Sequence, residues 1–150
     1  MNAVTHWLIL PGRLDVCTSD RLAWHLFTVE GMRLLRERLA AGGILAIQFI
    51  GDDGPWSASL SCTVNATFGE SLMLSAAVDI APVGPRWLLA GRDYPARLPE
   101  AIFASSEDRL PWRTVTVADE GALLTDDHFP AELHWARVAR QWRSLYTSSP

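Results

Sequence analysis

The sequence predicts an α/β domain, and three observations carry that prediction. Apolar residues recur at helical spacing between residues 29 and 39 and are followed by the glycine pair Gly42-Gly43. Residues 44–50 then form a short, nearly continuous apolar run, which is typical of a strand buried on both faces in a parallel sheet. A strongly amphipathic segment lies near the C-terminus. Helix, glycine turn and buried strand in this order are half of a βαβ unit.

The composition is that of one folded domain. The chain has 150 residues, of which 49% are hydrophobic and 20% are charged, so a hydrophobic core of ordinary size can form. There are 17 acidic and 13 basic side chains, which give a formal net charge of -4. Because this charge repels polyanions, we expect no nucleic-acid partner.

Targeting, membrane and metal-binding signals are missing from the sequence. No basic region precedes the apolar run 7–10, and no apolar run reaches the roughly 20 residues of a membrane span. The two cysteines, Cys17 and Cys62, show neither metal-ligand spacing nor a disulfide framework, and the histidines are scattered. We therefore expect a cytoplasmic protein with no membrane contact and no bound metal.

The first predicted helix begins after Thr28. Thr28 can cap it, Glu30 suits the positive end of the helix dipole, and three apolar residues share one face: Met32, Leu35 and Leu39. We expect this helix to end at Gly42-Gly43 and the buried strand 44–50 to follow. Gln48 is the only polar residue of that strand. Because a buried amide needs partners, it is either satisfied by backbone groups or exposed in a pocket.

A dense turn signal, residues 51–55, follows this strand at its carboxyl end, which is where α/β sheets bind ligands. Apolar residues then step by four, which favours a helix over residues 56–68: Leu60, Val64 and Phe68. Residues 72–80 and 86–90 read as strands. The connection between them, residues 81–85, is too short for a crossover helix, so we expect these strands to be antiparallel neighbours.

The C-terminal third is predicted to be a long loop and a helix. Residues 91–120 are mostly loop, with a short strand at 114–117. The final helix has Asp127 as its cap, Pro130 in its first turn, and an apolar stripe of Trp135, Val138, Trp142 and Leu145. This stripe favours packing in the core or at an interface over a stacking platform for a ligand.

Two acidic segments are candidate sites. Asp15 and Asp20 flank small polar residues and could bind an amine, orient a proton or cap a helix. Thr125 and Asp126 lead into the last helix, where an aspartate ahead of a proline is first of all a cap. Taken alone, the residues favour solvated acids or caps in both places. The sequence has no glycine-rich phosphate loop and no GxSxG nucleophile elbow.

Taken together, these segments resemble the C-terminal half of spermidine synthase-like proteins. The resemblance rests on the order and spacing of four segments: Asp15-Val16-Cys17-Thr18-Ser19-Asp20, His25-Leu26-Phe27-Thr28-Val29-Glu30, Arg38-Leu39-Ala40-Ala41-Gly42-Gly43-Ile44-Leu45-Ala46 and Leu124-Thr125-Asp126-Asp127. It implies the C-terminal part of a Rossmann-like, methyltransferase-type sheet that ends in an antiparallel strand pair and an amphipathic helix.

The resemblance also implies an activity, the transfer of an aminopropyl group from decarboxylated S-adenosylmethionine to a polyamine. Asp15 matches the acid that activates the attacking amine, and Asp20 matches a second acid that holds a cationic polyamine. Gln48 sits where some members present a glutamine to the substrate. Thr125 and Asp126 form the late threonine-aspartate motif, which we expect to bind substrate. Carboxylates suit these tasks, because they bind an ammonium ion and accept its proton.

The chain departs from the family pattern in three places. Phe49 stands where the family often has Glu, and Arg21-Leu22-Ala23 replaces the proline common after the second acid. The glycine-rich loop that holds the nucleoside has no room ahead of Asp15, so S-adenosylmethionine or its decarboxylated form has no binding motif here. The remaining sheet would expose a central edge. We therefore expect a truncated reading frame, a fragment, or a subunit that buries this edge against itself or a partner.

Two other functions stay open from the sequence. The chain could be a non-catalytic module that dimerises through the free sheet edge or through the face of Trp135 and Trp142. It could also belong to an S-adenosylmethionine-dependent methyltransferase, because a shared fold does not fix the group that is transferred.

Overall fold

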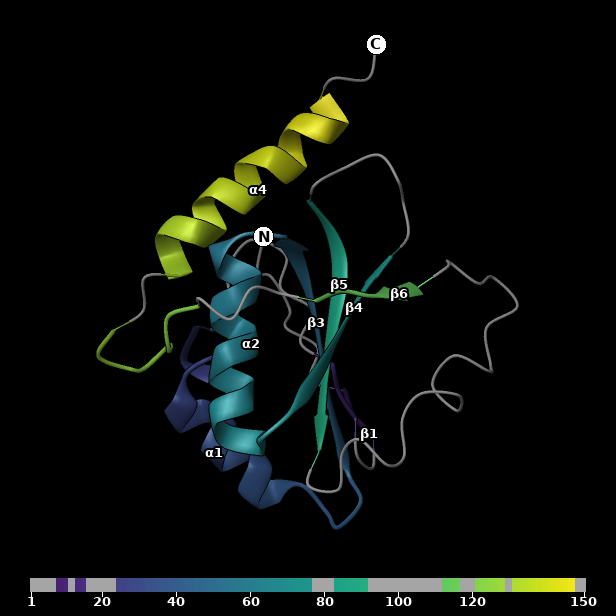
Figure 1. Cartoon of the computed structure of the whole chain (residues 1–150), viewed down its shortest axis with the longest axis vertical. Helices are drawn as coiled ribbons and strands as arrows, with labels where there is room; N and C mark the ends of the chain where they lie inside the picture. The colour runs from purple at the N-terminus through teal and green to yellow at the C-terminus, as the bar shows by residue number, and fades with distance from the viewer. Residues whose placement is uncertain are drawn as a thin grey trace.

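The computed structural model of the chain describes residues 8–10, 13–15, 24–76, 83–91, 112–116, 121–128 and 131–147. The elements in chain order are β1 (Leu8–Leu10), β2 (Arg13–Asp15), the 3-10 turn η1 (Trp24–Leu26), α1 (Val29–Arg38), β3 (Ile44–Asp52), α2 (Pro55–Phe68), β4 (Ser71–Ala76), β5 (Val83–Gly91), β6 (Trp112–Thr114) and α4 (Ala131–Thr147) (Figure 1).

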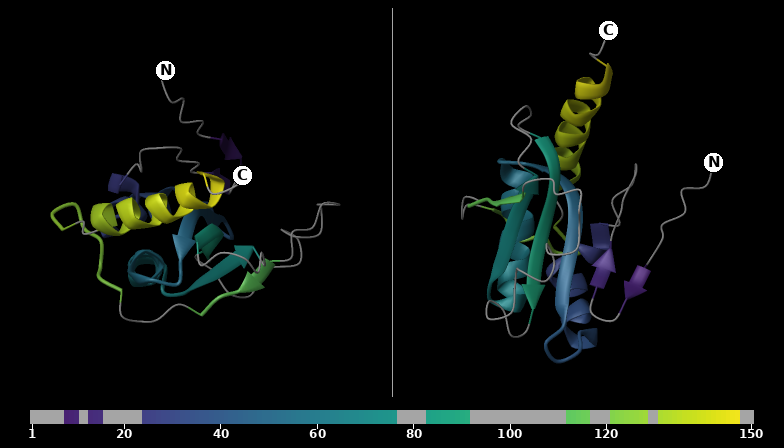
Figure 2. Two further views of the ribbon diagram at one scale, coloured as in Figure 1. Left: turned by 90° about the horizontal axis from the view of Figure 1, so that it is seen from above. Right: turned by 90° about the vertical axis from the view of Figure 1, so that its right-hand side faces the viewer.

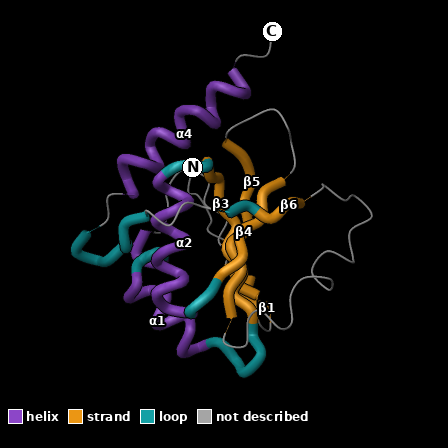
Figure 3. Tube along the Cα trace, in the orientation of Figure 1, coloured by secondary structure: helices purple, strands orange, loops and turns teal. Residues whose placement is uncertain are grey.

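The main sheet has four strands in the order β3-β5-β4-β6. Both β3 and β4 pair antiparallel with β5, so they run parallel to each other with β5 inserted between them. Helix α2 joins β3 to β4, and α1 and α2 lie on the same side of the sheet (Figures 1 and 3). The described strands and helices therefore form a mixed α/β fold that matches the predicted class.

Strand pairing differs from one sequence-based prediction. The apolar run 44–50 does form a buried strand, but the parallel pairing predicted for it is wrong, because its partner in this sheet is the antiparallel β5. The physical reason is the short connection after β4, which brings β5 back antiparallel to β4. Because β5 lies between β4 and β3, and these two run parallel to each other, β5 is antiparallel to β3 as well. The predicted antiparallel pairing of β4 with β5 is confirmed. In addition, β2 contacts β3, and β1 and β2 form a small antiparallel pair beside it (Figure 2).

Helix α1 begins as its sequence predicts. The backbone N–H of Gly31 donates to Oγ1 of Thr28 at 3.1 Å, which confirms Thr28 as the cap. The helix ends at Arg38, earlier than the predicted end at Gly42-Gly43, because Leu39 is already extended. Gly42 has a φ of 70°, so it makes the turn into β3 at a position where other residues would be strained.

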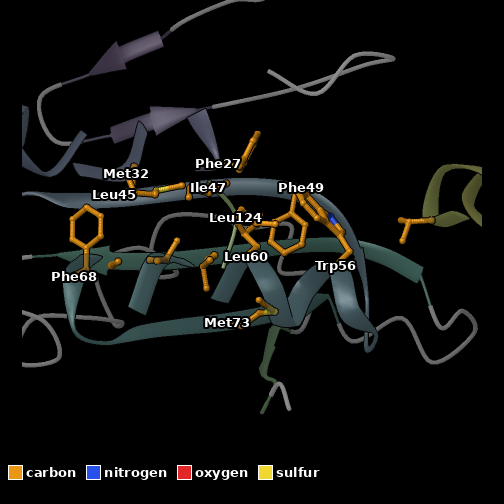
Figure 4. Packing of buried hydrophobic residues seen from close by; sticks show 14 of the residues in the cluster. Phe27, Met32, Leu45, Ile47, Phe49, Trp56, Leu60, Phe68, Met73 and Leu124 are labelled. Carbon is orange, nitrogen blue, oxygen red and sulfur yellow. The ribbon is translucent and has the colours of Figure 1, made fainter. Parts of the chain in front are cut away.

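The hydrophobic core lies between α2 and the sheet face that it covers (Figure 4). Trp56 is fully buried, and its ring meets those of Phe27 and Phe49 edge to face, with ring centres 6.0 and 6.1 Å apart. The predicted stripe of α2 is buried here: Leu60, Val64 and Phe68. Burying one such side chain contributes about 1.5–3 kcal/mol, so α2 is a main source of stability.

The C-terminal elements agree with the prediction in part. The short strand β6 spans Trp112–Thr114, ahead of the predicted 114–117. Val138 of α4 is buried and Trp142 packs against the same core, which confirms core packing for these two residues. The side chains of Trp135 and Leu145, and residues 129–130 next to the predicted cap Asp127, lie outside the described part of the chain.

Among the helices that the structure describes, none is long and apolar enough to cross a membrane.

Candidate functional site

The best-defined polar site lies where β3 ends and α2 begins. Asp52 closes the strand, and its Oδ1 accepts a hydrogen bond from the backbone N–H of Gly54 at 3.1 Å. Pro55 then starts α2, with Gly54 as a cap that offers no side-chain hydrogen bond. The turn is therefore tight, and the Asp52 carboxylate, rather than a side chain of the cap residue, lies at the positive end of the α2 dipole.

A buried arginine lies beneath this turn. Arg86 is only 3% exposed, and on the sheet it is in register with Phe49 of β3 and Ser75 of β4. Its Nη2 donates to Oδ1 of Asp53 at 2.6 Å, and its Nη1 lies 3.8 Å from Sδ of Met73. The side chain of Asp53 is 71% exposed. A buried cation thus has a counter-ion at the surface, and removing that charge would leave Arg86 poorly solvated.

Gly51 sits between this arginine and α2. A Cβ added at Gly51 would lie 2.7 Å from Cδ of Arg86, 2.7 Å from Oγ of Ser57 and 2.6 Å from the ring of Phe49. These side chains therefore converge on one point, which only glycine leaves open. Within the described ranges, Oγ of Ser57 and Nε of Arg86 are both buried and have no hydrogen-bond partner.

Residues 121–128 form a strap across α1 and α2. The Leu124 N–H donates to Oγ1 of Thr63 at 3.0 Å, and the Ala122 N–H donates to Oγ of Ser59 at 3.1 Å. On the α1 side, the Val29 N–H donates to the carbonyl of Leu124 at 2.8 Å. The strap is thus fixed to both helices by its backbone.

The predicted residues Thr125 and Asp126 lie at the end of this strap. Oγ1 of Thr125 accepts a hydrogen bond from the His128 N–H at 3.0 Å, so this hydroxyl stabilises a local turn. The Asp126 N–H donates to Glu30 of α1 at 3.2 Å, and the Asp126 side chain is exposed. Both residues therefore lie at the amino-terminal end of α1.

The other predicted site residues lie elsewhere. Gln48 is half-buried opposite Trp87, on the sheet face turned away from α2, so the sheet separates it from Thr125 and Asp126. Asp15 is the last residue of β2, and its side chain falls outside the described part; Asp20 falls outside it altogether. The binding roles of all five residues remain predictions. Nowhere in the described ranges do three His, Cys, Asp or Glu side chains gather as a metal site.

Sequence reasoning missed Arg86, Ser57 and Asp53 as a group. One signal was present, because Arg86 is a charged residue at the start of an apolar run. Its partner Asp53 lies far away in the sequence, and only the register between β3 and β5 brings the two together.

Comparison with known proteins identifies the fold of the chain and leaves its activity undetermined. No family model and no curated protein matches the sequence. The structure is similar to that of a probable spermidine synthase from Corynebacterium glutamicum, with a TM-score of 0.58 and 13% identity. The match covers 77% of this chain and 47% of that one, so the chain spans about half the length of this structural relative. The chain therefore has a spermidine synthase-like fold.

Proposed function

We propose that this chain is the amine-binding part of a transferase of the spermidine synthase class. The fold match to a probable spermidine synthase carries the proposal. Two acids at strand ends support it, because Asp15 is the last residue of β2, Asp52 is the last residue of β3, and the two strands are in contact. Ligands of α/β sheets bind outside the carboxyl ends of strands.

The proposed roles follow from the chemistry of amines. An alkylamine is protonated at neutral pH, so it must lose a proton before its nitrogen can attack. Asp15 would accept that proton, and Asp20 would hold a second ammonium group of the substrate. Thr125 and Asp126, fixed at the end of the strap, would line the same substrate site. The overall reaction that we propose is aminopropyl transfer, with methyl transfer as the other reaction that this fold supports.

The described residues do not fit the nucleoside of a donor such as S-adenosylmethionine or its decarboxylated form. The glycine-bounded turn at residues 51–54 is the described loop nearest in type to a nucleotide cradle, and side chains already fill it around Gly51. We therefore place the donor outside these residues and assign the described part of the chain to the amine side only.

A second candidate function is a non-catalytic module that dimerises. Partly exposed apolar side chains favour it, because Leu72 and Trp87 are only half-buried on the sheet face turned away from α2, and Leu34 of α1 is 61% exposed. Such a module would form dimers and would not bind amines.

Calorimetric titration with putrescine tests the proposal. We expect binding by the wild-type chain and at least tenfold weaker binding by Asp15→Asn, a loss of about 1.4 kcal/mol. Glu70→Gln is the matched control, because it removes an exposed acid at the far end of α2. Equal binding by the wild-type chain and Asp15→Asn contradicts the role of Asp15. Absence of binding together with a dimer in sedimentation supports the second candidate.

A further inference from the structure

The buried guanidinium of Arg86 is only partly paired with oxygen. A guanidinium carries its N–H donors in a fixed fork, and a carboxylate meets it best with two oxygens on two nitrogens. Asp53 uses one oxygen on Nη2, at 2.6 Å, whereas the described part of the chain offers no hydrogen-bond partner to the buried Nε. Of the three guanidinium nitrogens, Nη2 is therefore the only one with an oxygen partner among the described residues.

Two further groups beside Arg86 favour a negative ligand. Ser57 is the third residue of α2, is 0% exposed, and its Oγ has no hydrogen-bond partner among the described residues. That oxygen and Cδ of Arg86 face the same point above Gly51. The first turn of α2 holds no acidic residue and its cap Gly54 has no side chain. The Asp52 carboxylate accepts from the Gly54 N–H at 3.1 Å, so an acid outside the helix meets part of the positive charge of the helix end.

We propose that Arg86, Ser57 and the first turn of α2 form a binding site for the carboxylate of a ligand, and that Asp53 stands in for that carboxylate in the free chain. The difference in exposure supports this exchange. Asp53, with a side chain 71% exposed, can turn out into water, whereas Arg86 stays buried. The ligand carboxylate would then take the place of the Asp53 oxygen on Nη2 of Arg86.

This inference rests on the proposed amine function and narrows its substrate class. When the ligand carboxylate pairs with Arg86, the carboxylate of Asp53 loses its ion pair and stays at the same turn, next to Asp52. A released carboxylate attracts an ammonium group. The site therefore fits a molecule that carries both an amine and a carboxylate, such as an amino acid, better than it fits a simple diamine.

Ornithine and putrescine test the inference, because they differ only by one carboxylate. We expect calorimetry on the wild-type chain to show at least tenfold tighter binding of ornithine. In Arg86→Gln this preference disappears while putrescine binding stays the same. Equal binding of ornithine and putrescine by the wild-type chain overturns the carboxylate site and agrees with the proposed amine binding.

Asp53→Asn provides a test that does not depend on Arg86→Gln folding, because Asp53 is mostly exposed. Butyrate, a probe with a carboxylate only, should bind this variant at least fivefold more tightly than wild type and raise its melting temperature. Glu70→Gln should behave as wild type. Unchanged butyrate binding in Asp53→Asn overturns the inference, as does a preference for inorganic phosphate over butyrate. Butyrate binding that needs Arg86, with no binding of either amine, supports the carboxylate site and rejects the amine function.

Discussion

The backbone N–H of Val29 donates a hydrogen bond to the carbonyl of Leu124 at 2.8 Å. This bond joins the first turn of α1 to the strap of residues 121–128, and Leu124 is itself fully buried in the core. The strap therefore holds the predicted threonine-aspartate motif against α1, at a place that the folded backbone defines. The position of Thr125 and Asp126 thus depends on the buried Leu124 and its backbone hydrogen bond, in addition to the Thr125 hydroxyl that stabilises the local turn.

Thr63 tests how the strap is held. Its Oγ1 accepts from the Leu124 N–H at 3.0 Å and donates to the Ser59 carbonyl at 2.7 Å. Thr63→Val keeps the shape but leaves a buried N–H without an acceptor, so we expect a loss of about 1–3 kcal/mol in the free energy of unfolding. Urea denaturation measures this loss, and amide exchange at Leu124 should become faster.

Thr67→Val is the control for that variant. Thr67 is buried on the same helix, but its Oγ1 makes only a helix-internal bond to the Thr63 carbonyl at 3.2 Å among its described hydrogen bonds. Its loss should be smaller and should leave exchange at Leu124 unchanged. Equal effects of the two variants would mean that the strap does not depend on Thr63.

Gly51 and Gly84 form a second matched pair, because they are register partners on β3 and β5. A Cβ at Gly51 would meet three side chains at 2.6–2.7 Å, whereas a Cβ at Gly84 would meet nothing within 4 Å. We expect Gly51→Ala to cost about 1–3 kcal/mol of stability through overpacking. Gly84→Ala should be neutral or slightly stabilising. The urea denaturation midpoints of Gly51→Ala and Gly84→Ala test this difference. Similar midpoints for the two variants would contradict the crowding around Gly51.

Two leucines that differ in burial test how much the core between α2 and the sheet contributes to stability. Leu60 of α2 is 0% exposed and Leu34 of α1 is 61% exposed. Leu60→Ala should lower the free energy of unfolding by about 2–5 kcal/mol, because it leaves a cavity between α2 and the sheet. Leu34→Ala should change it by less than about 0.5 kcal/mol. A large loss at Leu34 would show that α1 packs against something in solution, such as a second copy of the chain.

Local features of this fold could be predicted from the sequence, and its long-range pairings could not. The cap at Thr28 and the buried stripe of α2 were predicted correctly, because a cap and a helical period involve only near neighbours in the chain. The antiparallel pairing of β3 with β5 depends on a connection between distant segments, so an apolar run alone could not distinguish it from parallel pairing.

The same limit applies to the candidate site. Gln48 had two open interpretations, and only the sheet register shows that it is half-buried opposite Trp87, away from α2. The ion pair of Arg86 with Asp53 needs that register too. Oγ of Ser57 becomes notable only once its buried surroundings are known. For Thr125 and Asp126 the motif was visible in the sequence, whereas its contact with the amino-terminal end of α1 was not.

Amide shifts in a nitrogen-15 heteronuclear spectrum test the central claim, that this chain binds an amine through its acidic segments. The full chain is titrated with putrescine and the shifted amides are assigned. Our account predicts that the largest shifts fall at Asp15, at Asp20 and over residues 124–127, and that Asp15→Asn suppresses them. Shifts confined to exposed acids elsewhere, such as Glu37 and Glu70, or no shifts at all, would contradict it.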